Sequence, residues 1–333
     1  MAKKEKRVLS IFFEGLKIYC LNIHKFLLYM LFPVLGQLLG IWLVFGITYW
    51  YTSNIQDLSA KFPVLNEPTS MIFGALLAII PGLIIFMRAF WDYLVSYGAL
   101  NSMTEGYLNT GKVYDFKSHN EVVLNKTFSF IALWFIFGIF TLIAIIPIFW
   151  IIGFIFFVYF VLIFQVFTFE NGLSPIGYFR RSLQIIKGNF ARTFLLMTIL
   201  VLLTYYLLAS GLTVIFDYLN WTQPLSKGLE NWVLTLPIEP LEPLGITPAK
   251  ISLMIVQNII MFVAVGFTLP LRSICWTLWY NNLNDIESDE IQKPKKKSSA
   301  KKITKKTPKT FKIEKREIDP EIIRRARLED DEY

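Results

Sequence analysis

Long uncharged apolar runs dominate the chain and are separated by short polar segments. Runs of about 18 or more apolar residues with few charges are typical of membrane-spanning helices. Six segments fit this description, at residues 26–51, 71–93, 128–146, 148–168, 193–216 and 251–280. The pattern therefore predicts an all-α polytopic membrane protein with six transmembrane helices.

The third and fourth predicted spans come from one continuous stretch, because no charged residue occurs between Thr127 and Phe169. A single helix of this length would measure roughly 64 Å, which is about twice the thickness of the hydrocarbon core. Two helices must therefore share the stretch. We expect the turn between them at Pro147, which Trp150 and Gly153 follow.

Lysine and arginine are distributed unequally between the two sides that the six spans define. Of the 33 basic residues, all but Lys61, Lys227 and Lys250 fall on the side of the N-terminus. The asymmetry persists when the C-terminal tail is left out of the count. Because basic loops stay in the cytoplasm, the distribution predicts a multi-pass plasma membrane protein with both termini cytoplasmic.

Two segments on the cytoplasmic side have the spacing of amphipathic helices. In 174–190, Ser174 is expected to cap the helix and Pro175 to take its first position. The apolar stripe of this segment is Ile176, Phe179, Leu183, Ile186 and Phe190. The stripe of segment 8–23 is Val8, Phe12, Leu16, Tyr19 and Ile23. We expect both helices to lie in the headgroup layer with their basic sides toward anionic lipid.

The two amphipathic segments are similar to each other. A shift of 167 positions aligns Phe12 with Phe179 and Leu16 with Leu183. The same shift places Asn22 on Asn189, and each of these residues directly precedes a predicted span. The similarity predicts a duplicated unit, in which an interfacial helix is followed by a span that runs outward from the cytoplasm.

Composition divides the chain into three parts. Residues 1–25 form a cytoplasmic amphipathic segment, 26–283 form the six-span domain, and 284–333 form a basic tail. Within the tail, 291–316 is rich in Lys, Thr, Ser and Pro and is predicted to be disordered. The loop 217–250 is rich in proline and is predicted to be irregular or to lie partly on the membrane surface.

Overall composition excludes several classes of protein. Charged residues make up 17% of the chain, against about 25% in soluble domains. The two cysteines, Cys20 and Cys275, and the two histidines, His24 and His119, form no pattern typical of a disulfide framework or a metal site. No Walker loop, HExxH, GxSxG or CxxC motif occurs. We therefore expect no enzymatic activity and no cofactor.

Four polar residues within the spans are candidates for a structural or functional role. Arg88 and Asp92 are four residues apart and share one helix face. They are interpreted either as a charged element that guards a path or as a local pair near the headgroups, and we favour the local pair. Gln37 and Gln165 could line a cavity, but a single amide in a span more often bonds to a neighbouring helix.

A second set of candidates lies near the cytoplasmic ends of the spans. Glu170 ends the fourth span and is expected to pair with Arg180, Arg181 or Arg272, either to fix the loop, which we favour, or as a proton or substrate site. The residues expected to contact lipid or a partner are Arg180, Arg181, Lys187, Arg192, Lys295, Lys296 and Lys297. Each Lys or Arg near an anionic surface contributes about 1 kcal/mol.

Two stretches carry a resemblance to a known family. In 167–194 a span ends in Glu170 and Gly172, a helix carries Arg181 and Ser182, and the motif Lys187-Gly188-Asn189 precedes the next span. In 269–283 a proline and a threonine precede an aromatic-rich run. Both stretches resemble the membrane domain of glycerophosphoryl diester phosphodiesterases and its uncharacterised bacterial multi-pass relatives.

The resemblance implies a membrane module of the bacterial inner membrane. Family members often end the closing span with Y-x-D-L-R, where this chain has Asn282 and Asn284 in place of the acid and the arginine. Some members are fused to a phosphodiesterase barrel, but these 333 residues contain no soluble segment of about 200 residues that would house one. The resemblance therefore implies the membrane domain without the catalytic domain.

These observations favour a non-catalytic membrane module that organises lipids or partner proteins at the cytoplasmic face. The expected partners are the bilayer, its anionic phospholipids, and a protein bound through the C-terminal tail. Nucleic acid is disfavoured, because the basic run has no interleaved aromatic residue beyond Phe311 to stack on bases. The alternative is a transporter for a small or lipidic substrate, which the prolines Pro33, Pro81 and Pro270 and the repeat favour. An intramembrane enzyme is a third hypothesis, for which the sequence shows no polar cluster.

Overall fold

The computed structural model describes residues 6–113, 116–234 and 246–292, and these residues form helices without a β-strand. Six helices or helix pairs are long and apolar enough to cross a membrane. They are Ile23–Ser53, Pro68–Thr110, Thr127–Ile145, Pro147–Phe169, Phe190–Tyr218 and Pro248–Asp285. The predicted all-α polytopic membrane fold with six spans is thereby confirmed.

The chain folds into two compact units, which we describe separately. Unit 1 contains residues 1–23, 97–198 and 270–333. Its helices are α1 (Val8–Leu21), the part of α4 (Pro68–Thr110) from Tyr97 onward, α5 (Phe116–Leu124), α6 (Thr127–Ile145), η2 (Pro147–Phe149), α7 (Trp150–Phe160), α8 (Ile163–Phe169), α9 (Pro175–Ile186), most of α10 (Phe190–Val201) and most of α14 (Leu269–Gln292).

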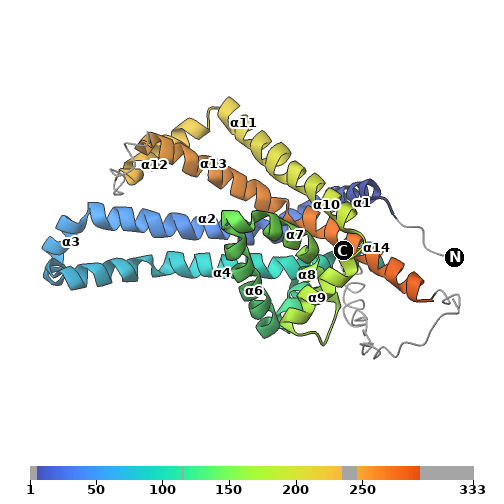
Figure 1. Ribbon diagram of the computed structural model, residues 1–333. Coiled ribbons are helices and arrows are strands. Elements are labelled where there is room, and N and C mark those ends of the chain that lie inside the picture. The colour runs from blue at the N-terminus through green and yellow to red at the C-terminus, as the bar shows by residue number, and fades with distance from the viewer. Residues whose placement is uncertain (1–5, 114–115, 235–245, 293–333) are drawn as a thin grey trace, which may run out of the picture. The chain divides into compact units, whose positions relative to one another are not determined.

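Unit 2 contains residues 24–96 and 199–269. Its helices are α2 (Ile23–Ser53), α3 (Ile55–Lys61), η1 (Pro63–Asn66), the first part of α4, the π-helix η3 (Leu202–Ala209), α11 (Ser210–Tyr218), α12 (Thr222–Val233) and α13 (Pro248–Phe267). Within this unit α2 and the first part of α4 run side by side and are joined by α3 (Figure 1).

Small residues allow α2 and α4 to approach closely. A Cβ atom on Gly40 would lie 2.6 Å from the backbone nitrogen of Phe86, and one on Gly36 would lie 2.8 Å from the Cβ of Ala89. Van der Waals packing of this kind drives helix association in membranes, where no hydrophobic effect separates protein from lipid. The α2–α4 hairpin is therefore fixed by glycine contacts.

Several helix starts follow from local sequence. Ser174 caps α9, where its hydroxyl accepts a hydrogen bond from the backbone N–H of Gly177, and Pro175 takes the first helical position, as predicted. Thr247 caps α13 in the same way, and Pro248 follows it. Pro147 opens the short turn η2 between α6 and α7, at the expected place. Proline suits these positions because the first helical N–H has no partner within the helix.

The structure also differs from the expected boundaries. The helix that contains the second span continues to Thr110, well beyond residue 93. The proline-rich loop contains the helix α12, while residues 235–245 lie outside the described part. Helix α14 runs to Gln292, so the first residues of the predicted tail are helical, and the disorder expected for 291–316 concerns residues that lie almost entirely outside the described part.

Helix boundaries repeat at the same shift of 167 positions that aligns the two amphipathic segments. Helices α1, α2 and α3 begin at Val8, Ile23 and Ile55, and α9, α10 and α12 begin at Pro175, Phe190 and Thr222. Helix α5 likewise precedes the hairpin of α6 and α7. The chain order is therefore a short helix followed by a helical hairpin, three times in succession.

Candidate functional site

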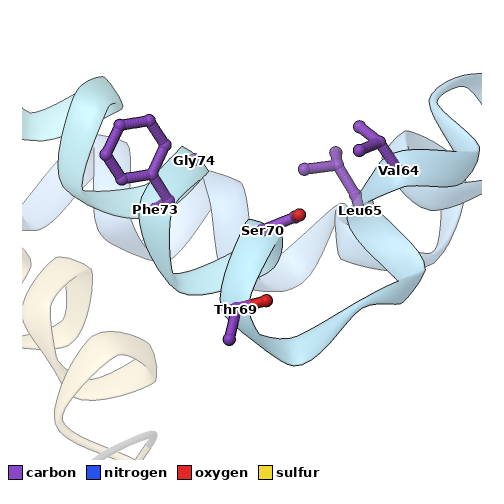
Figure 2. A pocket seen from close by; sticks show the side chains of 6 residues that line it. All are labelled: Val64, Leu65, Thr69, Ser70, Phe73 and Gly74. Carbon is purple, nitrogen blue, oxygen red and sulfur yellow. The ribbon is translucent and has the colours of Figure 1, made fainter.

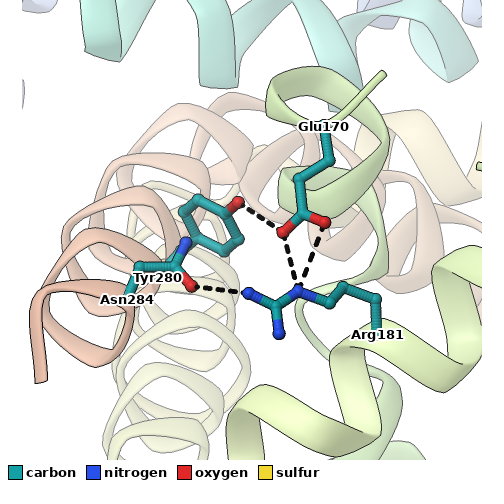
Figure 3. Close-up of polar contacts among 4 residues, drawn as sticks. All are labelled: Glu170, Arg181, Tyr280 and Asn284. Atoms are coloured by element: carbon teal, nitrogen blue, oxygen red, sulfur yellow. Dashed lines mark hydrogen bonds and ion pairs between the residues drawn. The ribbon is translucent and has the colours of Figure 1, made fainter. Parts of the chain in front are cut away.

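A buried ion pair in unit 1 joins the end of the fourth span to α9. Glu170 directly follows α8 and is 3% exposed. The Nε of Arg181 in α9 lies 3.0 Å from Oε1 and 3.2 Å from Oε2 of Glu170 (Figure 3). Removing a carboxylate from water is costly unless the charge is paired and hydrogen-bonded. Arg181 meets this requirement for Glu170.

Helix α14 completes the shell around this pair. The Tyr280 hydroxyl donates a hydrogen bond to Oε1 of Glu170 at 2.9 Å, and Nη2 of Arg181 donates to Oδ1 of Asn284 at 3.3 Å. Figure 3 shows both α14 side chains pointing toward the Glu170–Arg181 pair. Both carboxylate oxygens thus accept hydrogen bonds, and the pair ties α8, α9 and α14 together.

Lys126 attaches the start of α6 to the same place. Its Nζ donates to the backbone carbonyls of Phe167 at 3.0 Å and of Glu170 at 3.4 Å. It also lies 5.3 Å from the centre of the Phe167 ring. The last carbonyls of a helix have no partner within the helix and attract positive charge. Lys126 therefore supplies hydrogen bonds to the free carbonyl groups at the end of α8.

An uncharged layer lies beside the ion pair, within the same unit. Oδ1 of Asn101 in α4 accepts from Ser273 Oγ at 2.6 Å, Gln165 Nε2 at 3.1 Å and Thr277 Oγ1 at 3.4 Å. Nδ2 of Asn101 lies 3.4 Å from Oγ1 of Thr168. All five residues are buried. Polar side chains inside a membrane domain characteristically bond across helices in this manner.

The two layers form one feature, which we call the polar seam. It consists of Asn101, Gln165, Thr168, Glu170, Arg181, Ser273, Thr277, Tyr280 and Asn284. The four members from α14 are spaced four, three and four residues apart, so they share one helix face. Oε1 of Gln165 is buried without a partner among the described residues, so the seam retains one unused acceptor.

Most members of the seam are absent from the sequence-based candidates. Glu170, Arg181 and Gln165 are among those candidates, whereas Asn101, Thr168, Ser273, Thr277, Tyr280 and Asn284 are not. The sequence feature that indicates the α14 members is the helical spacing of polar residues along the last span. A search for long apolar runs does not detect this spacing. Asn284 accepts a hydrogen bond from Nη2 of Arg181.

The seam determines which side of α9 faces outward. Ser182 is fully buried, and its hydroxyl donates to the carbonyl of Tyr159 at 2.7 Å. Arg180 and Lys187 are exposed, as is Arg192 in the first turn of α10. The sequence offers Arg181 both as a lipid contact and as a partner of Glu170, and its side chain turns inward because the buried carboxylate of Glu170 requires a cation. Burial also raises the pKa of Tyr178 on the inner side of α9.

The buried face of α9 is rotated from the expected apolar stripe. The buried side chains are Tyr178, Phe179, Ser182, Ile185 and Ile186, whereas Ile176 is 66% exposed. In α1 the buried residues are Val8, Ile11, Gly15, Ile18 and Tyr19, so Phe12 and Leu16 of the expected stripe are only partly covered. Gly15 accounts for the rotation, because a Cβ there would lie 2.5 Å from Sγ of Cys275 in α14.

The other candidates are not members of the seam. In unit 2, Nε of Arg88 lies 3.1 Å from Oδ2 of Asp92, and Arg88 is exposed. Gln37 in unit 2 donates to the carbonyl of Pro33 in its own helix, at 2.6 Å. In unit 1, Arg272 lies in the first turn of α14 and is half-buried. Lys295, Lys296 and Lys297 lie outside the described residues.

The histidines show no sign of metal chemistry. His24 is exposed, and the Nδ1 of buried His119 lies 2.9 Å from the hydroxyl of Ser102. Within the described ranges, no three His, Cys, Asp or Glu side chains are grouped so that they could hold a metal ion.

A hollow of about 520 Å³ lies in unit 2 at the turn between α3 and α4. Figure 2 shows the residues that line it, which are Val64, Leu65, Thr69, Ser70, Phe73 and Gly74. Its lining is mainly apolar and contains no charged side chain. Tyr51 supports the adjacent turn by donating a hydrogen bond to the carbonyl of Met71 at 3.0 Å. The hollow offers two hydroxyl groups and no group that would act as an acid or a base.

Comparisons with known proteins do not identify the chain. No protein-family model matches it, no curated protein matches it, and no solved structure matches it. The assignment of function therefore rests on the residues and geometry of the chain itself.

Proposed function

We propose that this protein is a non-catalytic membrane module that binds the anionic lipids of the cytoplasmic leaflet through α9. The observation that carries the proposal is the anchoring of α9 by the Glu170–Arg181 pair. This pair holds one arginine inside, while the neighbouring Arg180 and the basic residues Lys187 and Arg192 stay exposed. A helix presented in this way places fixed positive charges where anionic headgroups lie.

The location of the proposed site follows from the charge distribution. The excess of basic residues on the α9 side of the spans supports a cytoplasmic location for that side and for both termini. We further propose the bacterial inner membrane and membership of the glycerophosphodiesterase membrane-domain family, without its catalytic domain. The shared residues support this assignment because they have structural roles, as Glu170 pairs with Arg181 and Gly188 adopts a φ of +92° between α9 and α10.

Lipid-dependent thermal stability tests the proposal directly. Wild-type protein is reconstituted in nanodiscs of neutral lipid or of a neutral and anionic mixture, and its Tm is measured in both. The variant R180Q/K187Q/R192Q removes the basic face of α9. The matched control, K61Q/K227Q/K250Q, removes three exposed lysines that lie on the opposite side of the predicted topology.

We expect anionic lipid to raise the Tm of the wild type and of the control variant, and to raise that of the α9 variant much less. A ligand that binds only the folded state stabilises it by an amount that grows with the ligand concentration relative to Kd. Equal stability of the wild type in neutral and anionic discs would contradict the proposal. It would also be contradicted if the α9 variant and the control variant lost the same share of the Tm increase that anionic lipid causes.

A transporter is the second candidate, and a feature of the fifth span favours it. Residues 202–209 form a π-helix, a conformation that often marks functional sites. Thr204 within it is fully buried, and its Oγ1 has no partner among the described residues. A shift of 167 positions places Gln37 of the first span on Thr204, so both repeats carry a buried polar residue at this position.

Thiol accessibility separates the two candidates. In the variant T204C, made in a C20S background, a transport path predicts reaction with a membrane-impermeant thiol reagent added to one side of a proteoliposome. A packed helix interface predicts no reaction from either side. Ala209, which is equally buried in the same π-helix, supplies the matched control A209C.

A further inference from the structure

Helix α1 has an exposed apolar flank that its contacts within the protein do not explain. Its buried face, centred on Gly15, packs against α14 in unit 1. On the opposite side Leu9 is 56% exposed and Phe13 is 61% exposed. An apolar surface of this kind on a folded helix indicates contact with another apolar medium.

The side chains of α1 separate into three sectors. Successive residues are about 100° apart around a helix, and the buried sector contains Val8, Ile11, Gly15, Ile18 and Tyr19. The next sector is apolar and only partly covered, and contains Leu9, Phe12, Phe13, Leu16 and Cys20. The third sector is mainly polar and contains Ser10, Glu14 and Lys17, with Leu21 at the last position of the helix.

The polar sector is organised by interactions at the start of the helix. Nζ of Lys6 lies 2.7 Å from Oε2 of Glu14, and the backbone N–H of Lys6 donates to Oδ1 of Asn282 in α14 at 3.0 Å. These contacts fix the rotation of α1 about its axis. The apolar and polar sectors therefore face two different directions away from the bundle.

Helix α9 shows the same three sectors in the same order around its axis. Its buried face is followed by Ile176 and Leu183 and then by Arg180 and Gln184. The shift of 167 positions places Leu9 on Ile176 and Leu16 on Leu183, whereas Phe13 falls on Arg180, so the two repeats share only the part of the flank next to the buried face. Both helices thus have an apolar strip beside their buried face.

We propose that the flank formed by Leu9, Phe12, Phe13, Leu16 and Cys20 is inserted among the acyl chains of the bilayer. The covalent structure supports lipid as the occupant, because only Asn22 separates α1 from the first membrane span, α2. A helix attached to a span in this way lies at the bilayer surface. With protein on one side, its remaining sectors are divided between lipid and water, as in interfacial amphipathic helices.

The inference goes beyond the proposed binding of anionic lipid. Insertion of an apolar flank depends on the acyl chains, whereas the basic face of α9 depends on the headgroup charge. The experiment therefore uses discs of neutral lipid, in which the anionic-lipid proposal makes no contribution. A failure of one proposal is thereby distinguishable from a failure of the other.

Nitroxide scanning of the full-length protein tests the insertion. Labels are placed at L9C and F13C on the apolar flank and at S10C and K17C on the polar flank, each in a C20S background. Native Cys20 provides a fifth position, which needs no substitution, and Cys275 is fully buried. Collision rates with oxygen, which concentrates in lipid, and with a water-soluble nickel chelate are compared for each label.

We expect labels at 9, 13 and 20 to collide several-fold more with oxygen than with nickel, and labels at 10 and 17 to show the reverse. Equal access of nickel to all five positions would overturn the proposal, because the flank would then face water. Shielding of 9, 13 and 20 from both reagents would also overturn it, because a protein surface would then cover the flank.

Discussion

Arg181 Nε lies within 3.2 Å of both oxygens of Glu170, and this single contact links the residue that follows the fourth span to α9. The two residues are only eleven positions apart, yet Tyr280 and Asn284 from the far end of the chain complete their shell. The Glu170 side chain is 3% exposed and that of Arg181 is 13% exposed, so the pair is largely shielded from solvent.

Substitution of Glu170 by Gln should destabilise the protein by about 3 kcal/mol, because it removes the carboxylate that pairs with the largely buried Arg181 charge. Thermal unfolding in neutral nanodiscs measures the effect. The exposed pair in unit 2 supplies the control, since Arg88→Gln should change stability by less than about 1 kcal/mol. Similar effects of both substitutions would show that the buried pair has no special role.

Substitution of Asn101 by Leu should remove the acceptor that Gln165 and Ser273 share. Each interhelical hydrogen bond in a membrane domain contributes about 0.6 kcal/mol, so the expected loss is about 1–3 kcal/mol once the donors are left buried. The control is Thr141→Val, whose hydroxyl bonds only to its own helix. An unchanged unfolding temperature for the Asn101 variant would contradict the interlocking role of the seam.

Two glycines of α2 should respond in opposite directions to replacement by Ala. A Cβ at Gly40 would lie 2.6 Å from the backbone of Phe86, so Gly40→Ala should cost about 1–3 kcal/mol. A Cβ at Gly46 meets no atom within 4 Å, so Gly46→Ala should be neutral or stabilise by up to about 1 kcal/mol. Both unfolding temperatures are measured side by side, and equal shifts would argue against close packing of α2 on α4.

Alkaline pH should destabilise the protein partly through Tyr19, which precedes the first span. Burial, together with the nearby Cys20, raises the pKa of Tyr19 to about 12. The neutral phenol is therefore favoured in the folded state. Its contribution to stability is complete below the ordinary pKa of 10 and is lost as the pH rises from about 10 to 12. The unfolding temperature of Tyr19→Phe should therefore fall less than that of the wild type as the pH rises over this range. Identical dependence of the unfolding temperature on pH in variant and wild type would contradict the prediction.

The sequence predicts the six spans well because each depends on local properties. Apolar length identifies a span, and Pro147 marks the turn within the uncharged stretch, where η2 lies. Ser174 and Pro175 likewise indicate the start of α9 through hydrogen bonding within a few residues. Such features require no knowledge of what the helices pack against.

The orientation of the amphipathic helices is predicted less well. The periodicity of α1 identifies an apolar side, but lipid and protein interior are equally apolar, so it does not separate the two. The contact of Gly15 with Cys275 decides that the buried face turns away from Phe12 and Leu16. A small residue is a weak sequence signal for burial, which explains the rotated prediction.

The sequence by itself determined the helical membrane fold, the number of spans and many of the helix ends, because apolar length, proline and capping residues act locally. Only the tertiary structure decided that Glu170 is held by Arg181 and Tyr280, and that Asn101 meets Gln165 and Ser273. These hydrogen bonds join positions up to 172 residues apart. They depend on how each helix is rotated and packed, and that rotation is set by contacts distributed over the whole unit.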